Sequence, residues 1–579
     1  MRTLPKLVAI IALSVALAPF ARAQTAPALS APIPSNMARM LPVPAHHGMV
    51  ASQEKRATHI GVEILKAGGN AVDAAVAVGF ALAVTHPQAG NIGGGGFMLV
   101  HLAARNETIA IDYRETAPAA SARTMFLDEK GEADPKKSRD SALGIGVPGT
   151  VAGLALAHEK YGSGKFTLAQ LIAPAIKLAH EGIQVDDELA DTLPRAAPRL
   201  AAWPSAAKIF LKNGAPLARG DTLVQGDLAS SLETIARDGP RAFYEGPLAD
   251  RIAAAVRGAG GIMTADDMKA YRAIERAPVR GSYRGYDIAS MPPPSSGGVH
   301  LIEMLNILEG FPLREHGAGA AATLHLMIEA MKPAYADRSE YLGDPAFVQV
   351  PIAGLTSKQY AATLRPAIDP ERARPADSIR PGNPPHEGDQ TTHFSVVDTE
   401  GNAVANTYTI NFYYGLGLVA DGTGILLNNE LDDFAAKPGA PNAFGLVGGD
   451  ANAPGPGKRP LSSMSPTILF RDGKVFLVTG TPGGSRIITT VLQVILNVID
   501  HRMNIAEAVA APRLHHQWMP DRVFIERGFS PDTIRLLEAK GHSFITVASF
   551  GSANSILVTP EGLAGAADPR QRGTLAEGY

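Results

Sequence analysis

The chain has 579 residues, of which 45% are apolar and 19% charged, with 53 basic and 56 acidic residues. This composition is typical of a globular protein with a sizeable core, and the net charge of −3 argues against nucleic acid or an anionic membrane as a partner. Cysteine is absent, which excludes thiol catalysis, iron–sulfur clusters and cysteine zinc sites.

The first residues are typical of a secretory signal. Two basic residues precede an apolar run over residues 7–17, and Ala21-Arg22-Ala23 is a small-x-small cleavage site. The alternative is a membrane anchor, but the run is far shorter than the ~20 residues needed to span a bilayer. We expect a signal peptide over 1–23, an Ala/Pro-rich tether over 24–44, and a periplasmic or secreted protein without a stable membrane anchor.

Helices and a strand are expected in the first hundred residues. Capping and glycine signals predict helices over 54–67 and 71–85, the second apolar nearly all round and therefore buried. Asp73 inside it is interpreted as a structural group. Gly93–Gly96 precede a strand over 97–102 instead of opening a helix, so close backbone packing is favoured over a phosphate-binding loop.

The chain changes character at a proline-rich segment. Residues 150–365 are helix-rich around a rigid-then-flexible loop at 292–298, whereas six prolines over 366–390 exclude regular structure. The elements expected after it are strands 391–397, 403–410, 467–470 and 475–479 and helices 487–499 and 505–509. This mixture without a fixed repeat indicates an α+β or layered α/β architecture.

Thr391 stands where the proline-rich segment meets a strand. A threonine hydroxyl needs a base to become a nucleophile. Cutting the Gln390–Thr391 bond would create an α-amine beside the hydroxyl, and such an amine, with a pKa of about 7.7–8.0, is a usable base near neutral pH. The alternative reading of Thr391 is an ordinary residue opening a β-strand.

Further candidates could complete a site. Gly483-Gly484 lie between a predicted strand and a predicted helix, where free N–H groups could form an oxyanion hole, although a tight turn also explains them. An arginine with hydroxyls suits a carboxylate, and two carboxylates with an amide suit an ammonium. Residues of these types are Arg114, Ser462 and Ser463, and Asn411, Glu430 and Asp433. Together they would bind an amino-acid zwitterion, though each alone also fits a solvated or structural role.

The histidines do not suggest a metal site. His46-His47 and His515-His516 are adjacent pairs whose side chains diverge on any regular element, and no His-Glu-x-x-His occurs. A serine triad is also disfavoured, because the chain has no Gly-x-Ser-x-Gly elbow. We expect no metal and no cofactor.

These motifs together resemble the γ-glutamyltranspeptidase family, from about Met49 to Tyr579. The resemblance is densest between Gln390 and Ser485. The matching segments are 391–398 (TTHFSVVD), 461–466 (LSSMSP) and 481–486 (TPGGSR), with support from 113–115 (YRE), 146–150 (GVPGT) and 294–298 (PSSGG).

The resemblance implies an α/β layered (αββα) N-terminal-nucleophile hydrolase fold, with two stacked, mainly antiparallel sheets flanked by helices. It implies a precursor that cuts itself between Gln390 and Thr391 into a large subunit (45–390 after the tether) and a small subunit (391–579) of one heterodimer. The implied reaction transfers the γ-glutamyl group of glutathione or glutamine-like amides to water, amino acids or peptides.

The resemblance also implies individual roles. Thr391 would be the nucleophile, Thr409 would support it by a hydrogen bond, and Gly483 and Gly484 would stabilise the oxyanion. The substrate α-carboxylate would be held by Arg114, Ser462 and Ser463. The substrate α-amine would be held by Asn411, Glu430 and Asp433.

One departure from the family concerns the lid loop matched by residues 438–449. Phe444 stands where bacterial members often have a tyrosine whose hydroxyl bonds the asparagine matched by Asn411. Phenylalanine cannot make that bond, so we expect a looser lid and an altered balance between hydrolysis and transfer.

Two other functions are compatible with parts of this sequence. A cephalosporin acylase of the same superfamily acts on glutaryl amides, which lack the α-amine, so the intact Asn411, Glu430 and Asp433 set argues against it. A periplasmic amino-acid-binding protein would never cut itself and would bind glutamate without turnover.

Overall fold

A computed structural model describes residues 41–380, 391–437 and 449–579. The expected signal peptide, most of the tether, Gln390 and Phe444 lie outside the described residues. None of the helices in the described ranges is long and apolar enough to cross a membrane.

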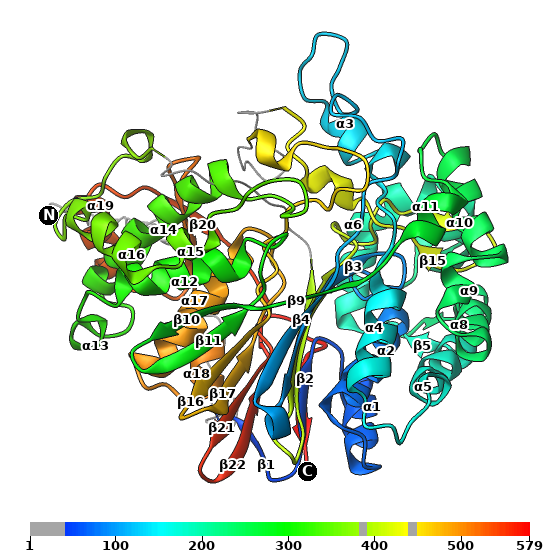
Figure 1. Cartoon of the computed structure of the whole chain (residues 1–579), viewed down its shortest axis with the longest axis horizontal. Helices are drawn as coiled ribbons and strands as arrows, with labels where there is room; N and C mark the ends of the chain where they lie inside the picture. Colours follow the sequence, from blue (N-terminus) through cyan, green and yellow to red (C-terminus); the bar gives the residue numbers. More distant parts are fainter. Residues whose placement is uncertain (1–40, 381–390, 438–448) are drawn as a thin grey trace, which may run out of the picture. The chain divides into compact units, whose positions relative to one another are not determined.

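Two seven-stranded antiparallel sheets form the centre of the described chain (Figure 1). The first sheet runs in the order β1 (Val43–Ala45), β22 (Gly562–Ala566), β21 (Ser555–Thr559), β17 (Lys474–Thr479), β16 (Thr467–Arg471), β11 (Tyr286–Ser290) and β10 (Val279–Tyr283). The second runs in the order β23 (Leu575–Gly578), β2 (Met49–Ser52), β12 (Thr392–Val397), β13 (Ala403–Thr409), β3 (Gly95–Leu102), β4 (Glu107–Tyr113) and β9 (Ile274–Arg276).

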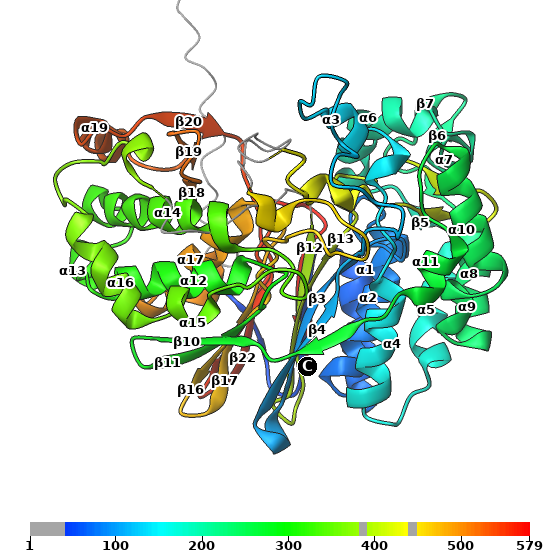
Figure 2. The same cartoon turned by 45° about the horizontal axis from the view of Figure 1, so that its top comes forward.

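Helices cover the outer face of each sheet (Figures 1 and 2). The first sheet shares a hydrophobic core with α12 (Gly297–Leu308), α14 (Ala321–Tyr341), α16 (Lys358–Leu364) and α17 (Arg486–Ile499). The second shares another with α1 (Lys55–Lys66), α2 (Ala71–Thr85), α4 (Thr150–Tyr161), α5 (Leu168–Glu181) and α8 (Gly226–Asp238). The predicted αββα layering is confirmed.

The other elements surround these layers. The further α-helices are α3 (Pro135–Ser138), α6 (Asp187–Ala201), α7 (Pro204–Phe210), α9 (Arg241–Tyr244), α10 (Pro247–Gly258), α11 (Ala265–Ala270), α13 (Leu313–His316), α15 (Ile352–Leu355), α18 (Ile505–Ala510) and α19 (Pro531–Ala539). Two-stranded sheets pair β14 (Val419–Ala420) with β15 (Ile425–Leu426), β5 (Ile183–Gln184) with β8 (Thr222–Leu223), and β6 (Leu211–Lys212) with β7 (Ala215–Pro216). A three-stranded sheet consists of β18 (Leu514–His515), β19 (Val523–Glu526) and β20 (Phe544–Val547).

The alternation of residues along β13 explains how the second sheet is buried on both faces. Ala403 and Ala405 belong to the core shared with the first sheet, whereas Val404 and Tyr408 belong to the core under the helices. Successive side chains of a strand point to opposite faces. Thr407 and Thr409 therefore share the face of Ala403 and Ala405, which is turned toward the first sheet.

The N-terminal predictions are confirmed with small shifts. Helix α2 has the predicted bounds, and its cap residue Asn70 forms a capping box with Asp73. The Asp73 carboxylate also accepts the Ser163 N–H, so its structural role is confirmed. A Cβ on Gly94 would lie 2.0 Å from the Thr409 carbonyl oxygen, which confirms close packing at the glycine run. Strand β3 begins at Gly95, two residues before the predicted start.

Several boundaries differ from the prediction, most of the strand and helix ends by one residue. The proline-rich segment contains two short 3-10 turns, Arg365–Ala367 and Ala376–Ser378, because proline is tolerated in the first turn of a helix or just before it. Strand β1 begins at Val43 and so takes the last residues of the expected tether. Helix α17 begins one residue before the predicted Ile487.

Candidate active site

Thr391 immediately precedes strand β12 and is 5% exposed. Thr392 pairs with Tyr408 in the β12–β13 ladder, so the same register places Thr391 opposite Thr409. Thr409 in turn pairs with Gly95. Thr391 therefore lies beside its expected supporting residue, on the face of the second sheet that is turned toward the first sheet.

The first sheet contributes the glycine turn to this region. Strand β17 ends at Thr479, and a Cβ on the next residue, Gly480, would contact the His393 ring at 2.4 Å. The carbonyls of Gly483 and Gly484 accept the N–H groups of Arg486 and Ile487, at 3.1 and 2.9 Å, where α17 begins. The turn is thus fixed between β17 and α17.

The two glycines have an unusual backbone conformation beside the cavity. Gly483 has φ of 132° and Gly484 of 57°, which L side chains rarely adopt. Within the described part of the chain, neither glycine N–H has a hydrogen-bond partner. Gly483 and Thr391 line the same cavity, whose volume is about 250 Å³. Free N–H groups at such a turn suit a developing negative charge.

The charged members of the expected zwitterion set meet in the structure. Arg114, which follows β4, pairs through Nη1 with Glu430 and through Nη2 with Asp433. Both carboxylates belong to the 3-10 turn Glu430–Asp433. All three side chains are at least 96% buried. The arginine expected to bind the α-carboxylate therefore forms ion pairs with the two acids expected to bind the α-amine.

The strand registers connect this cluster to Thr391. Thr409 pairs with Gly95, and Gly96 with Tyr113. Thr391, Thr409, Gly95 and Arg114 thus form one row across neighbouring strands. Because neighbouring strands lie ~4.8 Å apart, three steps place the backbones of Thr391 and Arg114 roughly 14 Å apart. An arginine side chain and a γ-glutamyl chain together can bridge that distance.

Acidic groups outnumber cations in this cluster. Burial raises the pKa of Glu430 well above its usual range, against the opposing effect of Arg114. Burial also raises the pKa of Asp433, again opposed by Arg114. Glu430 Oε2 and Asp433 Oδ1 are buried without a hydrogen-bond partner among the described residues. Two acceptors are therefore available to an ammonium group.

Glu115 is a member of the cluster that the sequence analysis did not assign. Its side chain is fully buried, and neither carboxylate oxygen has a hydrogen-bond partner in the described ranges. Burial raises its pKa to about 8, although Arg114, 4.0 Å away, opposes the shift. A Cβ on Gly95 would lie 2.6 Å from Glu115 Oε2. The glycine at this position in the row makes room for the carboxyl.

The serines of the expected set are held by the loop at residues 292–298. The Ser462 carbonyl accepts the Ser296 N–H at 2.7 Å, and the Ser462 N–H donates to the Pro294 carbonyl at 2.8 Å. Ser463 Oγ accepts a 3.1 Å hydrogen bond from Nη2 of Arg338, a buried residue of α14. No local pattern connects Arg338 to Ser463, because it lies 125 residues before that serine.

Asn411 lies beside the acidic turn. Its side-chain amide donates to the Asn429 carbonyl at 2.9 Å, and its backbone N–H donates to Thr409 Oγ1 at 2.7 Å. Its φ of 71° is in the left-handed region, which asparagine tolerates better than most residues. Asn411 thus connects Thr409 to the start of the Glu430–Asp433 turn.

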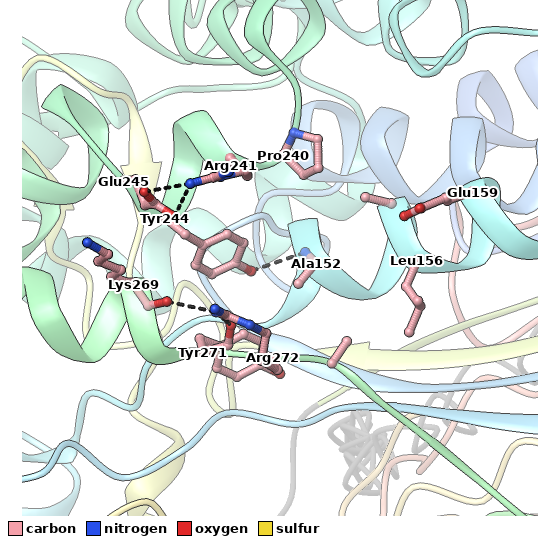
Figure 3. A pocket seen from close by; sticks show the side chains of 12 residues that line it. Ala152, Leu156, Glu159, Pro240, Arg241, Tyr244, Glu245, Lys269, Tyr271 and Arg272 are labelled. Atoms are coloured by element: carbon pink, nitrogen blue, oxygen red, sulfur yellow. Dashed lines mark hydrogen bonds and ion pairs between the residues drawn. The ribbon is translucent and has the colours of Figure 1, made fainter.

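Two stacked tyrosines, Tyr244 and Tyr271, lie on the wall of a surface cavity (Figure 3), and one of them is bonded to Arg114. The Tyr271 hydroxyl donates to the Arg114 carbonyl at 2.8 Å. The rings of Tyr271 and Tyr244 stack at 5.6 Å, and the Tyr244 hydroxyl donates to the Pro148 carbonyl at 3.0 Å. A surface cavity of about 450 Å³ lies over this pair, with Arg272 on its wall.

One group within the described residues has ligand atoms close enough for a metal ion, namely His325, Glu329 and His542. His325 Nδ1 and His542 Nε2 are hydrogen-bonded at 2.8 Å. The Glu329 carboxylate already accepts from Lys332 at 2.6 Å and Arg374 at 3.1 Å. Each oxygen of the carboxylate therefore already has a cationic donor with which a metal ion would have to compete, so we assign none.

Comparisons with known proteins agree with this geometry. The family described as Gamma-glutamyltranspeptidase matches residues 57–578. The glutathione hydrolase proenzyme of Escherichia coli (strain K12) is 57% identical over 541 residues, 93% of each chain.

Two solved structures also resemble the described fold. The structure of cephalosporin acylase from Bacillus halodurans has a TM-score of 0.83 at 30% identity, covering 93% of this chain and 97% of that one. The Helicobacter pylori gamma-glutamyltranspeptidase structure has a TM-score of 0.56 at 48% identity, covering 57% and 94%. The chain belongs to the γ-glutamyltranspeptidase family.

Proposed function

We propose that Thr391 is the nucleophile through which this enzyme, a γ-glutamyltransferase and glutathione hydrolase, cuts its own chain and then cleaves γ-glutamyl amides. One observation supports this role above the others. Thr391 immediately precedes β12, lies opposite Thr409 in the same register, and shares a cavity with Gly483, whose N–H has no hydrogen-bond partner among the described residues. A nucleophile, its support and an oxyanion donor therefore come from two facing sheets.

Self-cleavage would use the hydroxyl of Thr391 in the intact chain. Oγ1 attacks the Gln390 carbonyl carbon, the peptide C–N bond breaks, and the hydroxyl proton goes to the departing amine. The resulting ester is hydrolysed by water, which leaves the Gln390 carboxylate and a free α-amine on Thr391. This step creates the base that turnover needs.

Turnover would then proceed by acyl transfer. The α-amine takes the Thr391 hydroxyl proton, and Oγ1 attacks the γ-carbonyl carbon of the donor. The N–H groups of Gly483 and Gly484 stabilise the oxyanion. The proton passes to the leaving amine as the amide C–N bond breaks. Water or the amine of an amino acid or peptide then attacks the ester, and the proton returns to Thr391.

The buried charged residues would bind the α-carboxylate and the α-ammonium of the donor substrate. The substrate α-carboxylate takes the place of an acidic partner of Arg114 and accepts from the hydroxyls of Ser462 and Ser463. The substrate ammonium replaces the guanidinium as the partner of Glu430 and Asp433, with Asn411 beside them. Exchanging one set of ion pairs for another limits the cost of desolvating the zwitterion.

The remaining proposals concern maturation and location. A cut at Gln390–Thr391 would give a large subunit ending at Gln390 and a small subunit beginning at Thr391, which stay together as a heterodimer. Export through the signal over residues 1–23 would place the enzyme in the periplasm or outside the cell. Glutathione and glutamine-like amides would be the donors.

A glutaryl acylase is the second candidate, favoured by the similarity to the Bacillus halodurans cephalosporin acylase structure. The two functions differ in their need for a group that binds an α-amine. The test compares release of p-nitroaniline from γ-glutamyl and glutaryl anilides by the purified protein. We expect preference for the γ-glutamyl compound; preference for the glutaryl compound would reject the proposal.

A further inference from the structure

The cavity beside Thr391 is distinct from the zwitterion cluster. It is lined by Thr391 and Gly483, but none of Arg114, Glu430, Asp433, Ser462 and Ser463 lines it among the described residues. An amide cleaved at Thr391 has two halves. If the glutamyl half occupies the zwitterion cluster, the amine half must lie elsewhere against the same threonine, and this cavity is adjacent.

Three arginines line the cavity, namely Arg195, Arg486 and Arg570. Arg570 pairs with Glu526 at 2.7 Å and with Asp568 at 3.2 Å. Its charge is therefore balanced by ion pairs, whereas Arg195 makes no ion pair within the described residues.

Arg486 is the third arginine, and its charge is not balanced in this way. Its guanidinium lies 5.4 Å from the ring centroids of both Phe524 and Phe550. Within the described residues it makes no ion pair with a carboxylate and no side-chain hydrogen bond. Aromatic rings stabilise a guanidinium through its faces and leave its N–H edge available to an anion.

The position of Arg486 is fixed relative to the oxyanion turn. Its backbone N–H bonds the Gly483 carbonyl at 3.1 Å, and it is the first residue of α17. A half-buried arginine held by two rings loses little further conformational freedom when it binds a carboxylate. An amino acid or short peptide presents such a carboxylate a few bonds from its amine.

We propose that Arg486, held between Phe524 and Phe550, binds the carboxylate of the leaving peptide and of the acceptor amino acid or peptide. This inference rests on the proposed function, because it assumes acyl transfer at Thr391. It assigns the cavity as the subsite for the amine half of the reaction, with selectivity for amines that carry a carboxylate.

The test uses donors and acceptors that differ in that carboxylate. The donors are glutathione and γ-glutamyl-p-nitroanilide, and the acceptors are glycylglycine and glycylglycinamide. For Arg486→Gln, we expect the ratio of kcat/KM for glutathione to that for the anilide to fall about tenfold, the usual loss for a charge-assisted hydrogen bond. The corresponding ratio for the two acceptors should fall by a similar factor, and Arg486→Lys should recover part of both losses.

Arg471→Gln is the matched control, because Arg471 also lies over a phenylalanine ring, Phe476 at 5.3 Å, but does not line the cavity. We expect both ratios to stay at the wild-type value in this variant. Unchanged ratios in Arg486→Gln, or an equal fall in Arg471→Gln, would overturn the inference.

The wild-type enzyme provides a test that does not depend on folding of a variant. Its KM for glycylglycine should be about tenfold lower than for glycylglycinamide, and equal values would overturn the inference. If the wild type releases no product from any γ-glutamyl amide, the proposed function fails. If it turns over these donors without preferring carboxylate-bearing amines, only the assignment of Arg486 fails.

Discussion

Replacing Asp433 by asparagine tests whether the buried acids read the substrate ammonium. Asp433 Oδ2 lies 2.5 Å from Nη2 of Arg114, and its Oδ1 is buried without a partner among the described residues. Asparagine has nearly the same shape but carries no charge. The change therefore removes the negative charge that would pair with the ammonium, while keeping the size of the side chain.

The size of the effect follows from the hydrogen bond that is lost. A hydrogen bond to a charged group contributes ~1.5–3 kcal/mol, which corresponds to roughly 10–150-fold in kcat/KM. We expect Asp433→Asn to lose this much activity on γ-glutamyl-p-nitroanilide. Glutaryl-p-nitroanilide has no ammonium, so its kcat/KM should change by less than about threefold, the scale of a modest hydrogen-bond change.

The assay is the rate of p-nitroaniline release from the two anilides by variant and wild type. Separation of the two subunits on a denaturing gel serves as the control that the variant has folded and matured. An equal loss on both anilides would refute the reasoning, because Asp433 would then support the site without contacting the ammonium.

Three further predictions concern the same site. Burial raises the pKa of Glu430 and raises that of Glu115 to about 8, so protons compete with the substrate ammonium for these carboxylates. The KM for γ-glutamyl-p-nitroanilide should therefore rise as the pH falls from 8 to 5, and a KM independent of pH would contradict this. Arg338→Met should remove the bond that holds the Ser463 hydroxyl in place, and so raise the KM for γ-glutamyl-p-nitroanilide about 2–13-fold. The KM for a 4-aminobutyryl anilide, which lacks the α-carboxylate, should not change. Equal increases in both KM values would indicate a structural role for Arg338. Phe444→Tyr should restore a lid hydrogen bond and change the ratio of transfer to hydrolysis about 2–13-fold, and an unchanged ratio of the two products would sink the prediction.

Local signals in the sequence were sufficient for the framework around Thr391. The cap residue Asn70 and the glycines before it fixed α2, and the Asp472-Gly473 turn joined β16 and β17 as expected. The change from a proline-rich segment to a strand pattern predicted that a strand begins at Thr391. These features depend on neighbouring residues, whose spacing directly determines their geometry.

Long-range contacts could not be derived in this way. The sequence suggested that Arg114 and Glu430 bind opposite ends of a substrate, but not that they pair in its absence. Nor did any spacing indicate that α14 brings Arg338 to Ser463, or that Glu115 is buried with both oxygens unpaired. Such contacts depend on how the layers pack, and burial is the largest cause of the raised pKa of Glu115.

N-terminal sequencing of the purified protein is the most direct test of the central claim, that Thr391 cuts the chain and becomes the nucleophile. The wild type should give two bands on a denaturing gel, one of which begins at Thr391 and the other near Gln24. Thr391→Ala should give a single uncut band without γ-glutamyl transferase or hydrolase activity. A Thr391→Ala protein that still splits between residues 390 and 391 and retains turnover would contradict the account.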